Sequence, residues 1–229
     1  MAIPLTPTSE SSPDASAPSP SLVPRFNRTE RAIHWTYAVF FVLLLGTGLI
    51  MELPFLSVLV PDRYVLRQLH FASAFFLVVG PGLVALFGDR RTVTATAREF
   101  DQWDEDERRW FSDVWNGFGT SAARFNAGQK ANAVFTVGAT ILFVLTGVIM
   151  LTNIYGRLFP LWIVSNAAFV HDTLTWFVLV VWMGHLFLAL VYPATRPALR
   201  GMVTGFVRAS WAREHHPKWY EKVTGTRAK

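Results

Sequence analysis

The sequence contains no cysteine in its 229 residues. This absence excludes iron–sulfur clusters held by this chain, covalently attached c-type haem and cysteine-based zinc sites, because each of these needs cysteine ligands. A redox centre bound by this chain would therefore have to be held by histidine, of which there are six. The sequence also lacks a GxGxxG loop, so nothing in it predicts a dinucleotide-binding dehydrogenase domain.

Charged residues are scarce as well: they make up 16% of the chain, against 52% hydrophobic residues, and the mean hydropathy is +0.31. Such a composition is typical of membrane proteins. Four stretches lack Asp, Glu, Lys and Arg for about the 20 residues that a helix needs to cross a bilayer. They are residues 32–51, 68–88, 131–156 and 173–195. We therefore predict an all-α membrane protein, a bundle of four transmembrane helices.

The charges that are present lie mainly on one side of the predicted membrane. The net charge is +5, and the 21 Lys and Arg residues are spread along the segments between spans. Three precede the first span, seven lie between the second and third, and eight follow the fourth, whereas only Arg63, Arg67 and Arg157 lie on the other side. The positive-inside rule then places both termini in the cytoplasm. This distribution argues against a nucleic-acid partner, since no basic soluble module is present.

The segments outside the spans carry weaker predictions. Residues 1–24 are rich in Pro and Ser and contain no basic residue, so we expect a disordered extension rather than a secretory signal, followed by one membrane domain over residues 25–229. We expect Thr29 to cap the first helix. Residues 96–119 predict an amphipathic surface helix whose acids, including Glu107, face solvent. Residues 158–170 predict a segment lying flat on the external surface, and the basic C-terminal tail, with His215 and His216, a solvated segment.

Four histidines lie within or at the ends of the apolar spans: His34, His70, His171 and His185. His171 and His185 are 14 residues apart, about 21 Å along a helix, so one helix offers a ligand near each membrane face. Alternating helix direction pairs His34 with His185 on the cytoplasmic side and His70 with His171 on the external side. Facing imidazoles are the ligands of a low-spin electron-transfer haem, so two haem b sites are predicted. The alternative is a haem-free membrane anchor or transporter with packing or proton-relay histidines.

A chain that passes electrons across a membrane needs a donor and an acceptor. A quinone is the expected acceptor, because it dissolves in the bilayer and needs hydrogen-bonding groups near a haem. Asn126, Gly128 and Gln129, at the cytoplasmic start of the third span, offer two amides and a close backbone approach; an ordinary helix cap explains them equally well. Basic residues near a membrane face could bind haem propionates, namely Arg28, Arg31, Arg67, Arg124 and Lys130.

Two further strings of residues are specific enough to suggest a family. One is Arg124-Phe125-Asn126-Ala127-Gly128-Gln129-Lys130, and the other is the tail His215-His216-Pro217 followed by Trp219-Tyr220. Together with Arg25-Phe26-Asn27-Arg28, His34-Trp35 and the spacing of His171 and His185, they resemble the cytochrome b (gamma) subunit of membrane-bound respiratory formate dehydrogenases over residues 25–225. The transmembrane histidines alone are shared with hydrogenase cytochromes b.

The resemblance implies a role as the electron-transfer and quinone-reducing subunit of a formate dehydrogenase complex in the bacterial cytoplasmic (inner) membrane. A molybdenum- or tungsten-dependent alpha subunit would oxidise formate outside, and an iron–sulfur beta subunit would pass the electrons to the His70/His171 haem. They would continue to the His34/His185 haem and reduce menaquinone or ubiquinone near Asn126, Gly128, Gln129 and His185. The alternatives are a cytochrome b subunit of a hydrogenase or of a sulfur-compound reductase.

Overall fold

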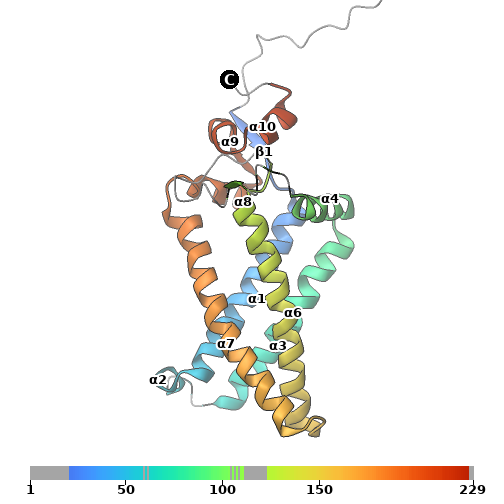
Figure 1. The fold of residues 1–229 in the computed structure, drawn as a ribbon, viewed down its shortest axis with the longest axis vertical. Helices are drawn as coiled ribbons and strands as arrows, with labels where there is room; N and C mark the ends of the chain where they lie inside the picture. Colours follow the sequence, from blue (N-terminus) through green and yellow to red (C-terminus); the bar gives the residue numbers. More distant parts are fainter. Residues whose placement is uncertain are drawn as a thin grey trace, which may run out of the picture.

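A computed structural model describes residues 21–226, except 59, 61, 104, 106, 108 and 111–122. Among the described residues, four helices are long and apolar enough to cross a membrane (Figure 1). They are α1 (Arg28–Glu52), α3 (Arg63–Phe87), α6 (Ala127–Gly156) and α7 (Leu161–Leu186), the last continued by the π-helix η2 (Phe187–Val191). Their outward side chains are apolar and exposed, as for Phe177 (63%) and Val180 (72%). This pattern is expected of helices solvated by lipid, and the prediction of four helices that can span a membrane is confirmed.

The four helices form two hairpins. Helix α1 packs along α3, with the short helix α2 (Pro54–Ser57) at their turn, and α6 packs along α7. Between the hairpins, side chains make the contacts: the hydroxyl oxygens of Tyr37 and Thr140 are 2.7 Å apart, and the rings of Phe41 and Trp182 lie 6.0 Å apart. The space between the hairpins is therefore where side chains from α1, α3, α6 and α7 meet.

The two hairpins begin in the same way. Asn27 caps α1 and Asn126 caps α6, and in each case the residue three positions on, Glu30 or Gln129, returns the bond to the backbone N–H of the cap. These reciprocal capping boxes satisfy backbone donors that a helix start leaves unpaired. The prediction that Thr29 caps α1 is wrong, because the chain is already helical there; the hydroxyl of Thr29 instead accepts from the backbone N–H of Asp89.

Residues 22–24 and 199–224 fold together at one end of the bundle. Strand β1 (Leu22–Pro24) pairs antiparallel with β2 (Phe206–Arg208), and helices α8 (Leu199–Thr204), α9 (Ala209–His215) and α10 (Pro217–Thr224) pack around them. We call residues 22–24 and 199–224 the cap. Val23 and Val207, opposite each other in the ladder, are 1% and 0% exposed. The prediction of a disordered extension over residues 1–24 is therefore wrong for residues 22–24, while residues 1–20 lie outside the described part.

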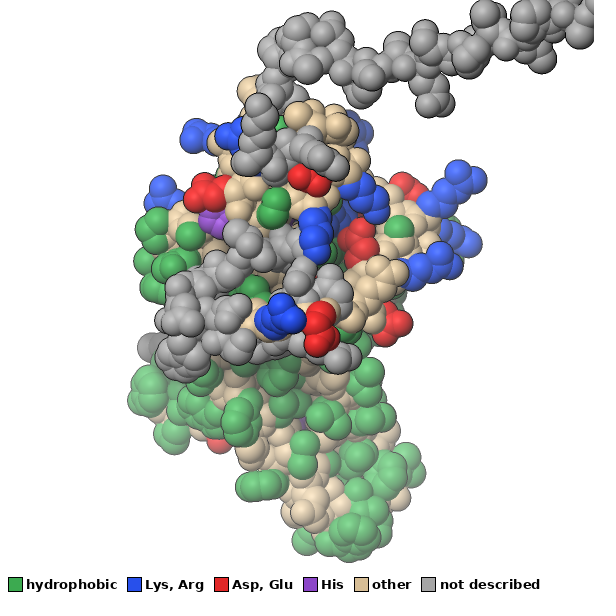
Figure 2. All heavy atoms as spheres, turned by 45° about the horizontal axis from the view of Figure 1, so that its top comes forward, with side chains coloured by type: hydrophobic (Ala, Val, Ile, Leu, Met, Phe, Trp, Pro, Cys, Tyr) green, Lys and Arg blue, Asp and Glu red, His purple; other side chains and the backbone are tan. Residues whose placement is uncertain are grey.

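The C-terminal tail is a folded part of the cap rather than a solvated segment. Trp211, Trp219 and Tyr220 are buried in its core, and His216 is 3% exposed. The expectation of solvation fails because the tail places aromatic residues among its charges, and these bury against β1 and β2. Charged side chains gather around this cap end, whereas apolar side chains cover the rest of the face shown in Figure 2.

The fourth span begins earlier than predicted. Residues 161–170 do not lie flat: they form the first turns of α7, which with η2 runs without interruption from Leu161 to Val191. The uncharged stretches 158–170 and 173–195 predict a boundary at His171-Asp172, yet a helix tolerates a polar residue that faces the protein interior, as His171 faces His70. His171 consequently lies ten residues inside the helix, about 15 Å from its start, rather than at a membrane face.

The connection between α3 and α6 starts with α4 (Arg90–Asp101), which Gln102 follows as the C-cap residue. Part of the predicted surface helix over residues 96–119 lies outside the described residues. The expectation that its acids all face solvent is wrong for Glu107, which is 3% exposed and forms an ion pair with the buried Lys130 of α6. A buried ammonium requires such a partner, so this contact fixes the connection onto the start of α6.

Candidate functional site

Two pairs of histidines face each other between the hairpins. His34 of α1 and His185 of α7 have ring centroids 6.5 Å apart. His70 of α3 and His171 of α7 also have ring centroids 6.5 Å apart. The first pair lies toward the cap end, since Trp35 donates to the carbonyl of Met202 in α8. The second pair, His70 and His171, lies farther from the cap along the bundle, and we call it the deeper pair. The structure thus brings together the four histidines in the pairs that helix direction predicts.

The separation of the rings suits a metal ion between them. With metal–nitrogen bonds of about 2 Å on both sides, two facing imidazoles have their centroids on the order of 6 Å apart. Both separations therefore fit two imidazoles that bind one haem iron.

Hydrogen bonds set the tautomer of the deeper pair. Thr47 Oγ1 lies 2.8 Å from Nδ1 of His70, and Thr146 Oγ1 lies 2.8 Å from Nδ1 of His171. Each hydroxyl has one hydrogen, which it donates to the carbonyl four residues earlier, Leu43 or Leu142, at 2.7 Å. The threonine oxygens must then accept from Nδ1–H of the histidines. This leaves Nε2 of each ring unprotonated, as a metal ligand must be.

Glycines stand beside the same two imidazoles. A Cβ at Gly48 would lie 3.6 Å from Cε1 of His70, and a Cβ at Gly147 would lie 3.7 Å from Cε1 of His171. The threonine that binds each histidine and the glycine that flanks it are therefore neighbours in sequence. A flat surface without a side chain beside a ligand ring is suited to a planar cofactor, which fits the donor set of the pair.

The pair at the cap end has different surroundings. His34 meets the edge of Trp35, with ring centroids 5.1 Å apart. Its Nδ1 is buried and has no hydrogen-bond partner in the described part of the chain. The two pairs are alike in ring separation, but the histidines of the deeper pair are fixed by threonines while His34 is not.

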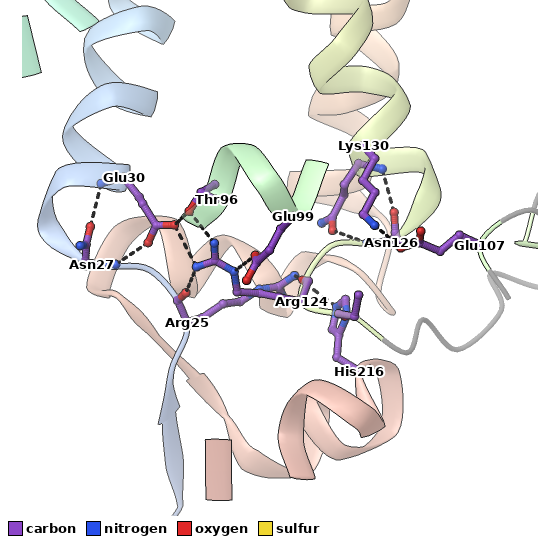
Figure 3. A network of polar contacts seen from close by, with 12 residues as sticks. Arg25, Asn27, Glu30, Thr96, Glu99, Glu107, Arg124, Asn126, Lys130 and His216 are labelled. Carbon is purple, nitrogen blue, oxygen red and sulfur yellow. Dashed lines mark hydrogen bonds and ion pairs between the residues drawn. The ribbon is translucent and has the colours of Figure 1, made fainter. Parts of the chain in front are cut away.

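At the cap end the two hairpins exchange contacts through Arg25 and Arg124. The side chain of Arg25 donates to the carbonyl of Arg124 at 2.8 Å, and that of Arg124 donates to the carbonyl of Arg25 at 3.1 Å (Figure 3). Arg124 also forms ion pairs with Glu30 at 2.9 Å and Glu99 at 2.8 Å. This network locks the start of α1 to the start of α6.

His216 connects the cap to this network. Its Nδ1–H donates to the carbonyl of Ala123 at 2.8 Å, and its Nε2 accepts from Arg25 at 3.2 Å. Burial, followed by the nearby charge of Arg25, lowers the pKa of His216 to about 3. Burial also lowers the pKa of Arg25 to about 9, with Arg124 adding repulsion. His216 therefore acts as a neutral hydrogen-bonding residue that joins the cap to Arg25 and Ala123.

The predicted quinone residues divide between two places. Asn126 and Gln129 line a small pocket of about 30 Å³ that they share with residues of the cap and of the segment after α7: Thr195, Ala198, Trp211, His215 and His216. Both amides also form the capping box of α6, so the helix-cap explanation holds for their oxygen atoms. Gly128 faces elsewhere: a Cβ there would lie 2.6 Å from the ring of Trp110.

The five basic residues considered as propionate contacts differ in whether their side chains already have a partner. Arg124 is engaged by Glu30 and Glu99, and Lys130 by Glu107. Arg31 and Arg67 each have a buried Nε without a hydrogen-bond partner among the described residues. Each of these two arginines lies three residues before a paired histidine, which is one helical turn. Nothing in the structure distinguishes Arg28 in this respect.

Sequence reasoning missed the two threonines, Arg25 and the structural role of His216. A signal for the threonines was present. Arg25 and Arg124 are 99 residues apart, as are Thr47 and Thr146, so the string Arg-Phe-Asn and the pair Thr-Gly both recur at one offset. This repetition indicates that the two hairpins are similar units, each contributing one threonine and one histidine to the deeper pair.

Four apolar helices holding two pairs of facing histidines define a class of protein, the membrane-embedded cytochromes b. A family model described as prokaryotic cytochrome b561 matches residues 25–205, and the chain belongs to this family. Membership implies that it binds haem b.

Curated relatives carry more specific names. The chain is 26% identical over 209 residues to the formate dehydrogenase cytochrome b556(fdo) subunit of Escherichia coli, covering 90% of this chain and 95% of the relative. It is 22% identical over 217 residues to the nitrate-inducible formate dehydrogenase cytochrome b556(Fdn) subunit of the same species, covering 91% and 94%. The formate dehydrogenase cytochrome b556 subunit of Haemophilus influenzae is 22% identical over 208 residues, covering 86% and 82%. The resemblance found in the sequence is confirmed.

Proposed function

We propose that this chain is the dihaem cytochrome b subunit of a formate dehydrogenase complex and passes electrons across the bacterial cytoplasmic membrane to a quinone. The observation that carries the proposal is the presence of two facing histidine pairs with ring centroids 6.5 Å apart, at two depths of a four-helix bundle. The names of relatives that match nearly the whole chain support the choice of formate dehydrogenase.

In this proposal the chain's own residues bind and orient two haems. His70 and His171 bind one, and His34 and His185 bind the other. When bound, haem b supplies reversible one-electron transfer. Arg31 and Arg67, with a buried Nε that lacks a partner in the described residues, are the proposed propionate contacts, because a carboxylate would satisfy the buried donor.

The pocket at the start of α6 is the proposed quinone site. It combines the amides of Asn126 and Gln129 with His215 and His216 from the cap. The pocket is small, about 30 Å³, so it suits one carbonyl oxygen of a menaquinone or ubiquinone and its hydrogen-bond donors, with the ring outside. Gly128 is withdrawn from the proposed contact set, since its α-carbon faces Trp110.

The proposed partners and orientation follow from the charge distribution and from the relatives. The cap end, where the basic segments lie, faces the cytoplasm. The opposite end, which carries α2, then faces the periplasm, where an iron–sulfur subunit and a molybdenum- or tungsten-dependent catalytic subunit would deliver electrons from formate. Protons for the quinol come from the cytoplasmic side, so electron flow through the chain charges the membrane.

Quantifying haem in the purified complex tests the proposal directly. We expect two haem b per chain, both reduced on addition of formate and neither by hydrogen. In the His171→Ala variant one haem should be lost, and formate should no longer reduce quinone. His215→Ala, which changes a histidine stacked on Trp211, should retain both haems. No haem in a well-folded wild-type preparation, or two haems in His171→Ala, would refute the proposal, and reduction by hydrogen would favour a hydrogenase partner.

A further inference from the structure

The deeper histidine pair is built symmetrically from the two hairpins. Thr47 and Thr146 hold His70 and His171 through the same atoms and at the same 2.8 Å distance. Both threonines are buried, at 5% and 7% exposure. Two matching threonine–histidine hydrogen bonds on opposite sides of one site would be an unusual coincidence of packing. They are better explained by a requirement of the site itself.

The direction of these hydrogen bonds has an electronic consequence. Each threonine hydroxyl donates its hydrogen to a helix carbonyl, and this polarises the oxygen and makes it a better acceptor. Acceptance from Nδ1–H shifts electron density toward Nε2 and makes the imidazole a more basic ligand. A more basic ligand stabilises the oxidised, more positive state of a metal, and so lowers its reduction potential. The two threonines act in the same sense, one from each side.

The pair at the cap end lacks this device on at least one side. Nδ1 of His34 is buried without a hydrogen-bond partner in the described residues. The imidazole of His34 is therefore a less basic ligand than those of His70 and His171, and a metal bound there is easier to reduce. The difference between the two sites arises from side chains of this chain alone.

We propose that Thr47 and Thr146 are positioning residues that lower the reduction potential of the His70/His171 site below that of the His34/His185 site. The difference directs electrons from the α2 end of the bundle toward the cap end. The inference rests on the proposed function, because it takes both histidine pairs to be haem ligands.

The test is a spectroelectrochemical titration of both haems in the purified complex. Thr47→Val and Thr146→Val remove the acceptor and keep the shape, so each should raise the lower of the two midpoint potentials. The double variant should raise it further, and the higher potential should stay unchanged. Thr47→Ser and Thr146→Ser keep a hydroxyl, so in these variants the lower midpoint potential should stay at its wild-type value.

A matched control is available on α6 itself. Thr152 donates to the carbonyl of Val148 at 2.8 Å, the same local bond that Thr146 makes, but forms no hydrogen bond with a histidine among the described residues. Thr152→Val should leave both potentials unchanged. If the valine variants lose haem, Thr47→Cys and Thr146→Cys serve instead: sulfur is a weak acceptor of similar size, so they should give a smaller rise in the same direction.

The outcomes separate the inference from the proposed function. Unchanged potentials in haem-replete valine and cysteine variants would overturn the inference, and so would a shift confined to the higher potential. If His70→Ala retained both haems, the ligand assignment itself would fail. Loss of one haem in His70→Ala together with unaltered potentials in the threonine variants would overturn the inference alone.

Discussion

Arg25 and His216 show how single polar residues hold the cap to the bundle. Arg25 is 3% exposed, and its guanidinium lies 4.9 Å from the ring centre of Trp211 and 5.7 Å from that of Trp219. Burying a cation costs free energy, which cation–π contacts and its bonds to the Arg124 carbonyl and to His216 offset. His216 can accept from Arg25 only while it is neutral. The stability of the cap is therefore coupled to the protonation of one imidazole.

This coupling predicts a pH dependence of stability. Because the pKa of His216 is lowered to about 3 in the fold, the unfolded chain binds a proton below pH 6.5 that the folded chain does not. Stability should fall as the pH drops below 6.5, by up to about 1.4 kcal/mol per pH unit. In His216→Gln, which can still donate to Ala123 and accept from Arg25, this contribution should vanish. Thermal unfolding followed by tryptophan fluorescence from pH 7.5 to 5 measures it.

The control for this experiment is the neighbouring histidine. His215 stacks on Trp211, and in the described part of the chain no hydrogen bond joins it to Arg25. His215→Gln should therefore keep the wild-type pH dependence. An equal slope in His216→Gln and the wild type would contradict the assignment of the effect to His216. Arg25, whose pKa is lowered only to about 9, stays charged throughout this range.

At the scale of the helices, α1 and α3 approach closely at a glycine. A Cβ at Gly80 would lie 2.7 Å from Cγ2 of Thr36, whereas a Cβ at Gly82, on the same helix, would meet nothing within 4 Å. Gly80→Ala should push the two helices apart and destabilise the hairpin by about 1–3 kcal/mol. Gly82→Ala should cost nothing. The temperature of half-unfolding in detergent is the measurement.

Removing the obstructing methyl group offers a rescue. Thr36→Ser takes away Cγ2 and keeps the hydroxyl, so the double variant Thr36→Ser with Gly80→Ala should regain most of the lost stability. If the two single variants simply added their effects, the close contact would not be the cause of the destabilisation.

The N-cap residues of α6 and α1 allow a second prediction at this scale, which concerns the proposed quinone site. Asn126→Ser keeps an oxygen to cap α6 but removes the amide NH₂ from the pocket. We expect formate to reduce both haems normally and quinone reduction to slow roughly three- to tenfold, the loss of one hydrogen bond. Asn27→Ser makes the same change at the cap of α1, away from the pocket, and should leave quinone kinetics unaltered. If quinone reduction slowed equally in both variants, the cause would be a weakened helix N-terminus rather than a lost contact in the pocket.

The helices also show what sequence patterns can and cannot predict. The spans follow from local hydropathy, because the lipid environment imposes it on every exposed position. Local signals failed where a tertiary contact decided the outcome. Thr29 has the side chain of a typical N-cap, yet α1 begins at Arg28 and Asn27 caps it. His171-Asp172 suggested a boundary inside what is one helix, because hydropathy does not report which polar residues face inward.

For the whole molecule too, local sequence patterns predict the histidine pairs but not the tertiary contacts of the rest of the site. The pairs were predictable since alternating helix direction fixes which ends meet. The cap was not, because Val23 pairs with Val207 across most of the chain, and no local pattern announces such a contact. The threonines behind His70 and His171 required the internal repeat to be noticed. The arrangement of two similar hairpins explains why one site is symmetric and the other, built from α1 and α7 alone, is not.

The orientation of the whole molecule gives the last prediction, and the chain is suited to its test because it contains no cysteine. Leu158 is 68% exposed between α6 and α7, and Val223 is 41% exposed on α10 of the cap. In Leu158→Cys, a membrane-impermeant maleimide added to spheroplasts should label the chain. In Val223→Cys, labelling should require lysis, because most basic residues lie at the cap end and the positive-inside rule retains that end in the cytoplasm. Labelling of Val223→Cys in intact spheroplasts, with protection of Leu158→Cys, would invert the proposed direction of electron transfer.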